Sequence, residues 1–337
     1  MAPKHLYLIE IVLFLLVVRP FSFAKETAGS NPVVQAGSFA GTAGCLILEA
    51  PQSKIRSVIA PSVGARIAEY SLAGENILWD NPDLSGKPRS VGGHQCDVGP
   101  EIRNIPSHPV LVSKAYTCET ANDGLARFTS ATCPVLGLVC EKRIRMGQDG
   151  SMLVEHVMKN VADKEQSYCH WDRTLCKAGG FVFFRLNKKS RFPAGWGIGR
   201  RSQKQPWEYD VEKPAHPNIK VLDGVLVAQA SGPEQKLGAD SDGGWIAYVR
   251  GRLLFVKHFP YNPQGDYTDC GMSVALYYND KFAEIEPMSP EISLKPQQQY
   301  IFGEKWTLTL LEREVTSHEQ ARVLADRIPA VPDLVLH

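Results

Sequence analysis

Short runs of alternating hydrophobic and polar residues recur along most of the chain, and residues that favour turns separate them. Alternation with a period of two is typical of strands that bury one face. Gly, Asp or Asn join several neighbouring runs, as in tight turns between antiparallel strands. The pattern predicts hairpins over residues 139–158, 219–228, 245–257 and 273–286, and a last strand over 306–311. In the third hairpin, Trp245–Val249 and Leu253–Lys257 flank Arg250-Gly251-Arg252.

One helix is predicted near the C-terminus. Ser317 can cap it, helix-forming residues continue to Ile328, and Pro329 and Pro332 end it. Antiparallel hairpins continue over the rest of the chain without a linker, which favours one all-β domain, a large antiparallel β-sandwich, over two domains. We expect a signal peptide over residues 1–24, a flexible lead-in over 25–40, the β domain over 41–313, and the helix with its tail over 314–337.

The first 24 residues have the pattern of a secretory signal peptide. Lys4 precedes an apolar stretch over residues 6–18, and Ser22-Phe23-Ala24 has small residues at the positions that signal peptidases prefer. An uncleaved anchor is the alternative, although the apolar stretch is short for a membrane span. We therefore expect a secreted or periplasmic protein with no membrane span after cleavage.

The charge of the chain is nearly balanced. Lys and Arg total 37, Asp and Glu total 36, and the net charge is +1 among 337 residues. A balanced chain has no global field to attract nucleic acid, so no nucleic-acid partner is expected.

The chain contains eight cysteines, an even number that favours disulfides in an exported protein. Local bridges between Cys133 and Cys140 and between Cys169 and Cys176 are conceivable, because both pairs have the same spacing. No CxxC pair and no HxxxH spacing is present, so we expect no structural zinc site.

Three segments contain side chains that could carry chemistry, whereas the signatures of serine hydrolases, nucleotide enzymes and zinc proteases are missing. The first is a glycine-rich loop with His94, Asp97 and Glu101, whose glycines let the backbone approach a ligand. The alternative is a turn with solvated side chains. Lys257 and His258 are interpreted as strand surface rather than as a phosphate site.

The second segment is Cys169–Thr174, in which Asp172 and Arg173 could orient the proton-exchanging side chain of His170. In the third segment, the period of a strand places Phe282, Glu284 and Glu286 on one face. Two carboxylates beside apolar neighbours can have a raised pKa and leave one as a base. The alternatives are a structural histidine and a solvent-facing strand surface.

A long loop over residues 188–217 is rich in aromatic and hydrogen-bonding side chains, among them Trp196. Aromatic faces with nearby polar groups suit a sugar, whose C–H face stacks while its hydroxyls need polar partners. A surface loop held by disulfides is the alternative.

Four segments together resemble the galactose mutarotase-like superfamily. They are residues 62–79 with Gly64-Ala65-Arg66-Ile67, the loop over 92–101, the strand over 170–174, and residues 284–306, which run from Glu284-Ile285-Glu286-Pro287 to Trp306. The resemblance covers about residues 44–311 and is closest to a secreted branch of the superfamily. It is weaker to the aldose 1-epimerases proper, because Cys169-His170-Trp171 stands in place of their N-H-x-Y-F-N-L stretch.

The resemblance implies a β-supersandwich with a sugar-binding cleft on one sheet and an acid–base pair that needs no metal or cofactor. By position, His170 would be the acid and Glu286 the base, with Glu284 as the second candidate for the base. His94 and Arg66 would contact sugar hydroxyls, and Asp97, Glu101, Asp172, Arg173 and Trp196 complete the expected binding residues.

Three functions remain open at this point. The first is an exported isomerase that interconverts anomers or epimers of a mono- or oligosaccharide. The second is a carbohydrate-binding protein without catalysis on the same fold, and the third is a polysaccharide lyase or glycosidase. The fold alone does not decide between them.

Overall fold

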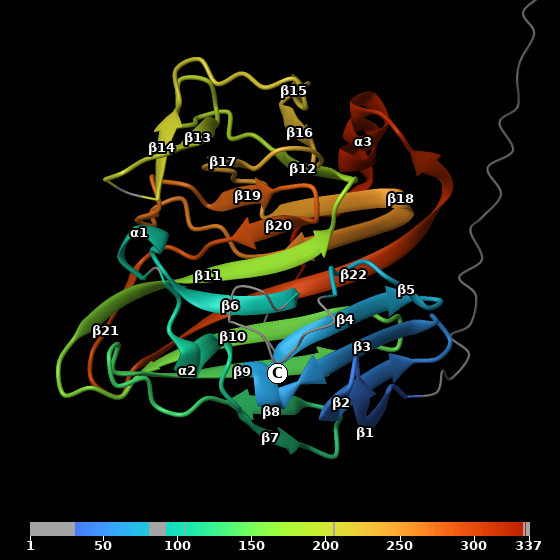
Figure 1. The fold of residues 1–337 in the computed structure, drawn as a ribbon, viewed down its shortest axis with the longest axis vertical. Helices are drawn as coiled ribbons and strands as arrows, with labels where there is room; N and C mark the ends of the chain where they lie inside the picture. Colours follow the sequence, from blue (N-terminus) through green and yellow to red (C-terminus); the bar gives the residue numbers. More distant parts are fainter. Residues whose placement is uncertain (1–30, 81–91, 105, 205, 333, 335–337) are drawn as a thin grey trace, which may run out of the picture.

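The computed structural model describes residues 31–80, 92–104, 106–204, 206–332 and 334. The chain forms two antiparallel sheets (Figure 1), which within the described residues contain 13 and 9 strands. The first sheet contains β1 Val33–Phe39, β2 Thr42–Ala50, β3 Ile55–Ala60, β4 Arg66–Leu72, β5 Glu75–Asn76, β6 Gly93–Gly99, β11 Gln166–Lys177, β13 Gly197–Arg201, β14 Trp207–Asp210, β17 Gln235–Ala239, β19 Val274–Tyr278, β20 Phe282–Pro287 and β21 Ile292–Leu294.

The second sheet packs against the first. Its strands are β7 Thr117–Thr120, β8 Ala126–Thr129, β9 Leu138–Met146, β10 Met152–Asn160, β12 Phe181–Arg185, β15 Ile219–Leu222, β16 Val225–Gln229, β18 Trp245–His258 and β22 Gln299–Val315. The predicted all-β antiparallel sandwich is confirmed. In the middle of the first sheet the order is β6, β11, β20, β19, β17, so segments far apart in sequence lie side by side (Figure 1).

Three of the four predicted hairpins are confirmed as β9–β10, β15–β16 and β19–β20. The remaining hairpin prediction, over residues 245–257, is wrong, because β18 runs through Arg250-Gly251-Arg252 as one strand. Gly251 takes a positive φ of 58°, and the register to β22 shifts there, so the glycine makes a bulge rather than a turn. The long partner β22, which continues to Val315, holds both halves of β18 in one strand.

The C-terminal helix is also confirmed. Helix α3 spans His318–Leu324, and Gln320 N donates to Ser317 Oγ at 3.3 Å, so Ser317 is its N-cap. A 3₁₀ turn at Ala325–Arg327 follows before Pro329. Two short helices, α1 Glu101–Asn104 and α2 Pro109–Val112, follow β6. No helix in the described ranges is long and apolar enough to span a membrane.

The expected lead-in over residues 25–40 differs from the structure. Residues 33–39 form β1, which pairs along its length with β2 at the edge of the first sheet. Its four central residues, Gln35-Ala36-Gly37-Ser38, are small or polar and hid the strand in the sequence, because edge pairing depends on backbone hydrogen bonds rather than on a buried apolar face. The signal-peptide prediction over 1–24 lies outside the described residues.

The expected disulfides are absent, since all eight cysteines are free thiols. Cys169 and Cys176 lie on the same strand, β11, seven positions apart. An extended chain rises ~3.3 Å per residue, so their Cα atoms are roughly 23 Å apart. A bridge needs Cα atoms within about 7 Å, which excludes this pair.

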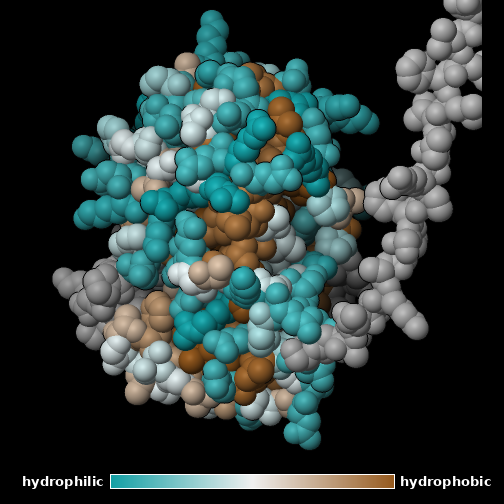
Figure 2. Space-filling model, turned by 90° about the vertical axis from the view of Figure 1, so that its right-hand side faces the viewer, coloured by the Kyte–Doolittle hydropathy of each residue, from teal (hydrophilic) through white to brown (hydrophobic). Residues whose placement is uncertain are grey.

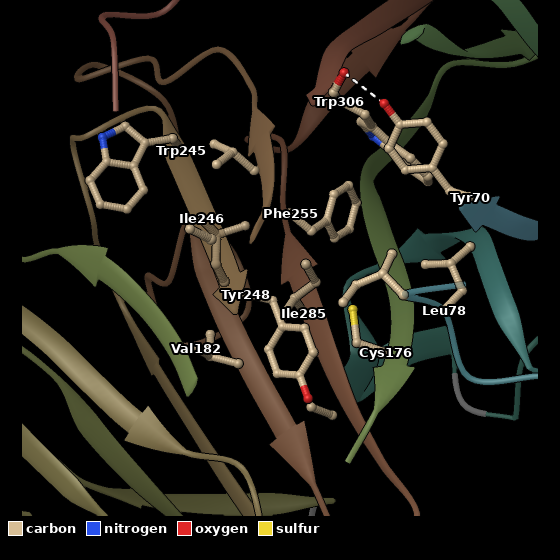
Figure 3. Packing of buried hydrophobic residues seen from close by; sticks show 14 of the residues in the cluster. Tyr70, Leu78, Cys176, Val182, Trp245, Ile246, Tyr248, Phe255, Ile285 and Trp306 are labelled. Carbon is tan, nitrogen blue, oxygen red and sulfur yellow. Dashed lines mark hydrogen bonds between the residues drawn. The ribbon is translucent and has the colours of Figure 1, made fainter. Parts of the chain in front are cut away.

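The core fills the space between the sheets. Tyr70, Phe255 and Trp306 make mutual edge-to-face contacts with ring centroids 5.3–5.8 Å apart (Figure 3). The Tyr70 hydroxyl donates to the Gly150 carbonyl at 2.9 Å, which satisfies a polar atom inside the core. Seen edge-on, hydrophobic residues gather in a band in the middle of the surface with hydrophilic residues around it (Figure 2). Such a band is expected where the interior of two stacked sheets reaches their edge.

Candidate functional site

Strand β11 presents different side chains on its two faces. Trp171 and Arg173 contact residues of β20 on the outer face of the first sheet. His170 and Asp172 point the other way, into the space between the sheets, where His170 stacks on Tyr300 with ring centroids 5.8 Å apart. Because neighbouring residues of a strand point to opposite faces, one step along β11 separates two chemical environments.

The outer face carries an open pocket with a volume of about 220 Å³. It is lined by residues of strands β11, β13, β14, β17, β19 and β20. Glu101, which comes after β6 and cis-Pro100, also lines it. Its walls are Glu101, Trp171, Arg173, Arg201, Pro206, Trp207, Lys236, Tyr277, Phe282, Glu284 and Glu286. We call this the outer pocket.

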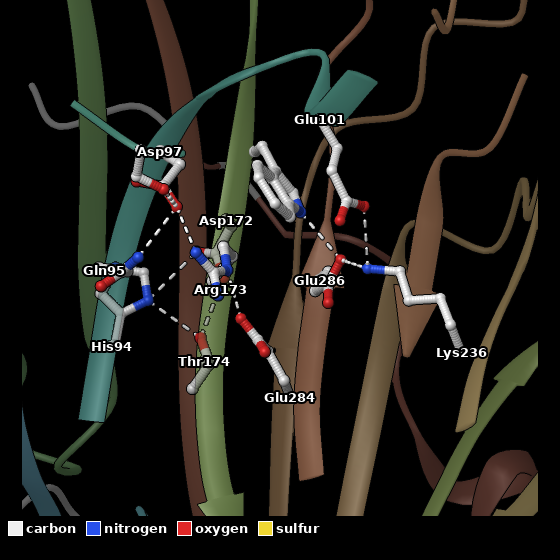
Figure 4. Close-up of polar contacts among 12 residues, drawn as sticks. His94, Gln95, Asp97, Glu101, Asp172, Arg173, Thr174, Lys236, Glu284 and Glu286 are labelled. Atoms are coloured by element: carbon white, nitrogen blue, oxygen red, sulfur yellow. Dashed lines mark hydrogen bonds and ion pairs between the residues drawn. The ribbon is translucent and has the colours of Figure 1, made fainter. Parts of the chain in front are cut away.

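A lysine between two carboxylates forms the floor of the outer pocket (Figure 4). Lys236 Nζ lies 2.5 Å from Glu286 Oε2 and 3.4 Å from Glu101 Oε2. Trp171 Nε1 donates to the same Glu286 oxygen at 2.8 Å. These contacts fix Glu286 from two sides and leave its carboxyl at the pocket wall.

Burial and neighbouring charges shift the pKa values of Glu286 and Lys236. Burial raises the pKa of Glu286, and the Lys236 ammonium partly offsets that rise. Burial disfavours the charge of Lys236, but Glu101 and Glu286 more than compensate and raise its pKa. The lysine therefore stays charged, while Glu286 is easier to protonate than an ordinary glutamate.

A second ion-pair chain borders the pocket (Figure 4). Arg173 donates from Nε to Glu284 Oε1 and from Nη1 to Asp97 Oδ2, the latter at 2.6 Å. Gln95 Nε2 and Ser107 Oγ also donate to Asp97 Oδ2, at 2.9 and 3.0 Å. Asp97 does not line the pocket, so it acts behind Arg173 and holds its guanidinium in place.

Aromatic rings supply the remaining walls. Trp207 lies under the Arg201 guanidinium, 4.1 Å from its ring centroid, and makes an edge contact with Tyr277. Arg173 lies 4.7 Å from the ring centroid of Trp171. A smaller hollow of about 50 Å³ shares Glu101, Pro206 and Trp207 with the outer pocket, so the two spaces adjoin.

The structure brings together only part of the predicted site. Glu284, Glu286, Glu101 and Arg173 line the outer pocket, and the predicted shared face of Phe282, Glu284 and Glu286 is confirmed. His170 is not with them. It is 2% exposed, and burial lowers the pKa of its ring to about 3. The expected pairing of His170 with Glu286 across one cleft is therefore wrong, because the two side chains lie on opposite faces of the sheet.

Four other predicted binding residues also lie away from the pocket. His94 and Asp172 are fully buried between the sheets, 3.3 Å apart, and Trp196 belongs to the apolar core. Arg66 is 0% exposed and donates to Gln95 Oε1 and to the Val112 carbonyl. Burial lowers its pKa to about 10. None of these side chains can reach a ligand in the outer pocket without a change in structure.

The pocket contains residues that the sequence did not single out. Lys236 and Tyr277 sit in short strands with no local motif, and Trp171 was noted only as the neighbour of His170. Arg201 and Trp207 belong to the loop that was expected to bind sugar, and that loop includes the β13–β14 hairpin. The alternation of side chains along β11 could have indicated Trp171 as a pocket residue, because it lies on the same face of the strand as Arg173.

No known family profile matches the chain, and no curated protein matches it in sequence. Solved structures do match. A galactose mutarotase-like protein from Clostridium acetobutylicum superposes with a TM-score of 0.57 at 11% identity, covering 83% of this chain and 99% of its own. One from Lactobacillus casei gives 0.56 at 11% identity, with 79% and 100% covered.

A galactose mutarotase related enzyme from Lactobacillus acidophilus gives a TM-score of 0.51 at 11% identity and covers 78% of this chain and 98% of its own. The chain has the galactose mutarotase-like fold. The resemblance seen in short sequence segments is thus confirmed for the fold, and the superposition extends over nearly the full length of the matched proteins. At such low identity the likeness does not assign an activity.

Proposed function

We propose that the protein binds a carbohydrate in the outer pocket. The observation that supports this most is the combination of Trp171 and Trp207 with the Glu286–Lys236–Glu101 trio in one open hollow. Carboxylates and an ammonium accept from and donate to sugar hydroxyls, while aromatic rings pack against C–H groups. The mutarotase-like fold of the chain adds support for a sugar as the ligand.

The size and charge of the pocket favour a neutral sugar. Three acidic side chains, Glu101, Glu284 and Glu286, face three basic ones, Lys236, Arg173 and Arg201, so neither sign dominates. A volume of about 220 Å³ suits one sugar ring. The adjoining hollow beyond Glu101 and Trp207 would take part of a second ring, which makes a disaccharide or chain end a ligand to test beside monosaccharides.

Interconversion of anomers at the same pocket is the second candidate function. It is favoured by the raised pKa of Glu286, which lets one carboxyl exchange a proton near neutral pH. In this reaction an acid protonates the ring oxygen while a base removes the proton of the anomeric hydroxyl. The bond between the anomeric carbon and the ring oxygen then breaks, and closure of the aldehyde after rotation gives the other anomer.

In this proposal Glu286 donates the proton and Glu101 accepts the other one. Lys236 stands between them, so it would orient both carboxylates and stabilise negative charge on the sugar. His170 has no part in this scheme. The reaction is complete within the sugar and two carboxyl groups, and it consumes no co-reactant.

Binding is tested first, with ligand-observed NMR on the full chain and a panel of neutral mono- and disaccharides. The proposal expects saturable binding of at least one sugar, which Lys236→Met weakens and Lys220→Met leaves unchanged. Lys220 is an exposed lysine on β15 that pairs with Glu319, away from the pocket. Binding that both variants retain would reject the outer pocket as the site.

Catalysis is tested on the same sugar by polarimetry or proton NMR of a freshly dissolved anomer. Acceleration that Glu286→Gln and Glu101→Gln both abolish would support the isomerase. Binding with uncatalysed rates of anomerisation would select the binding protein. Release of oligosaccharides from a polymer would instead favour the lyase or glycosidase.

We also propose that the protein is exported, because residues 1–24 have the signal-peptide pattern. N-terminal sequencing of the protein secreted by its host would locate a cut after Ala24 if this is right. An intact N-terminus in the cytosolic fraction would contradict export and would leave the pocket proposals unaffected.

A further inference from the structure

A polar cluster lies between the two sheets, on the face of β11 opposite the outer pocket. His94 comes from β6, Asp172 from β11 and His156 from β10, so the three side chains connect both sheets. Each is at most 2% exposed. One nitrogen of each histidine and one oxygen of Asp172 all lie within 4.8 Å of one another. Polar side chains buried this deeply need strong partners.

The separations within the cluster match those of metal ligands. Asp172 Oδ2 lies 3.3 Å from His94 Nδ1 and 3.6 Å from His156 Nε2. Zinc binds imidazole nitrogen and carboxylate oxygen at ~2.0–2.2 Å, so two ligand atoms at the tetrahedral angle are about 3.4 Å apart. The observed separations of 3.3 and 3.6 Å lie just below and just above this ligand–ligand distance.

Two of these atoms have no hydrogen-bond partner, although they are buried. They are Asp172 Oδ2 and His156 Nε2. His94 Nδ1 lies 2.9 Å from Thr174 Oγ1, and because the Thr174 hydroxyl donates to Asp172 Oδ1, the histidine nitrogen is the donor in this contact when no ion is bound. An ion bound at Nδ1 would replace that proton. Unpaired lone pairs that face one another in a dry interior repel, and a cation between them removes that cost.

Two carboxylates and two ammoniums surround the cluster, so its charges are already matched without an ion. Lys257 Nζ lies 2.5 Å from Asp172 Oδ1 and 3.1 Å from Glu304 Oε2, so one ammonium serves two carboxylates. Glu304 Oε1 is buried and has no hydrogen-bond partner. The Lys142 ammonium, which donates to the Ala65 carbonyl at 2.8 Å, opposes the ion. A zinc ion would therefore be held by its bonds to the ligand atoms rather than by an excess of negative charge.

We propose that His94, His156 and Asp172 bind a structural zinc ion that joins the two sheets. Two imidazoles and a carboxylate are a donor set that zinc accepts, and a water molecule would complete the tetrahedral site. The ligands come from three strands that are distant in sequence, which is why the absence of CxxC and HxxxH spacings did not reveal them. Lys257 and Thr174 both donate to Asp172 Oδ1 and so orient the carboxylate from behind.

The test is the metal content of the full chain, measured by mass spectrometry after purification and again after refolding with zinc or with cobalt. The proposal expects one ion per chain and, with cobalt, the intense visible absorption of a tetrahedral site. Asp172→Asn and His156→Gln should each abolish that absorption. His216→Gln, which changes a partly exposed histidine outside the cluster, should leave it intact.

The wild-type protein decides the matter even if the variants do not fold. A chain that refolds to its native state without zinc or cobalt, and that takes up neither metal at stoichiometric amounts, overturns the proposal. A metal that binds equally in the wild type and in both ligand variants overturns it as well, because the ion then lies elsewhere. Loss of thermal stability on chelation in the wild type, but not in the Asp172→Asn variant, supports it.

Discussion

The two faces of β11 show how differently one strand can use its charged residues. On the outer face, Trp171 and Arg173 border an open pocket that is lined by the Glu286–Lys236–Glu101 trio, although Lys236 and Glu286 are themselves buried. On the inner face, Asp172 is fully buried and His170 borders only a small hollow of about 20 Å³. Both faces are rich in polar side chains, so the type of residue does not separate function from structure here. The size of the adjoining pocket does.

The inner face should respond most strongly to mutation, through stability. Lys257 is 0% exposed and is shared by Asp172 and Glu304. Lys257→Met removes one partner of a buried ion pair and leaves two carboxylates without their cation, which should cost about 3–5 kcal/mol. Denaturant unfolding measures this. The exposed Lys220→Met control should change the free energy of unfolding by less than ~0.5 kcal/mol, and an equal effect of both would refute the contrast.

The outer face should respond through binding. Lys236→Met leaves Glu286 and Glu101 without the ammonium between them, so the dissociation constant of a bound sugar should rise at least ~10-fold, or about 1.4 kcal/mol. Calorimetric titration of the sugar found in the NMR panel measures this change. An unchanged dissociation constant, with the variant folded, would place the ligand outside the trio.

The two faces should also differ in their response to pH. Burial lowers the pKa of His170 to about 3, whereas an unfolded chain protonates a histidine near pH ~6.5. Unfolding therefore takes up a proton below that pH, and the free energy of unfolding falls as the pH drops from about 6.5 towards 3. The slope from this residue is at most about 1.4 kcal/mol per pH unit.

His170→Asn removes this part of the slope, and denaturant unfolding between neutral pH and about pH 5 would show the loss. If the ring were open to solvent, it would titrate near pH ~6.5 in the folded state as well. The wild type and the variant would then have the same pH dependence, against the assignment of His170 to the inner face.

A smaller effect is expected from the aromatic wall. Trp207→Ala removes the ring beneath Arg201 at the edge of the outer pocket. Aromatic contacts of this kind contribute ~0.5–1.5 kcal/mol beyond the area they bury, so affinity for a sugar should fall about 2- to 10-fold. The same calorimetric titration measures this loss of affinity. A loss larger than that caused by Lys236→Met would show that the Trp207 ring contributes more to binding than the Lys236 charge.

The sequence was a good guide to the fold and a partial guide to the site. Alternation identified three hairpins and the face shared by Glu284 and Glu286, because that signal depends only on the period of a strand. It failed at residues 250–252, where Gly251 forms a bulge and tertiary pairing with β22 keeps β18 continuous. Turn residues alone do not distinguish a turn from a bulge.

The prediction that His170 lies in the ligand site failed for a related reason. Nearly all residues from Cys169 to Cys176 are buried, on both faces of β11, so neither face looks like a surface in the sequence. In the structure His170 lies in the core and Trp171 lines the pocket, although polar side chains usually lie at the surface and apolar ones in the core. Lys236 and Lys257 gave no local signal, because their partners lie on strands far away in the chain.

Ligands should bind on the outer face of the first sheet. This is tested most directly by following the indole N–H signals of the six tryptophans by NMR while the sugar panel is added to the wild-type chain. Binding in the outer pocket predicts shifts for the indole signals of Trp171 and Trp207 and none for Trp306, which packs against His94 between the sheets. Shifts of Trp306 with Trp171 and Trp207 unmoved would contradict it.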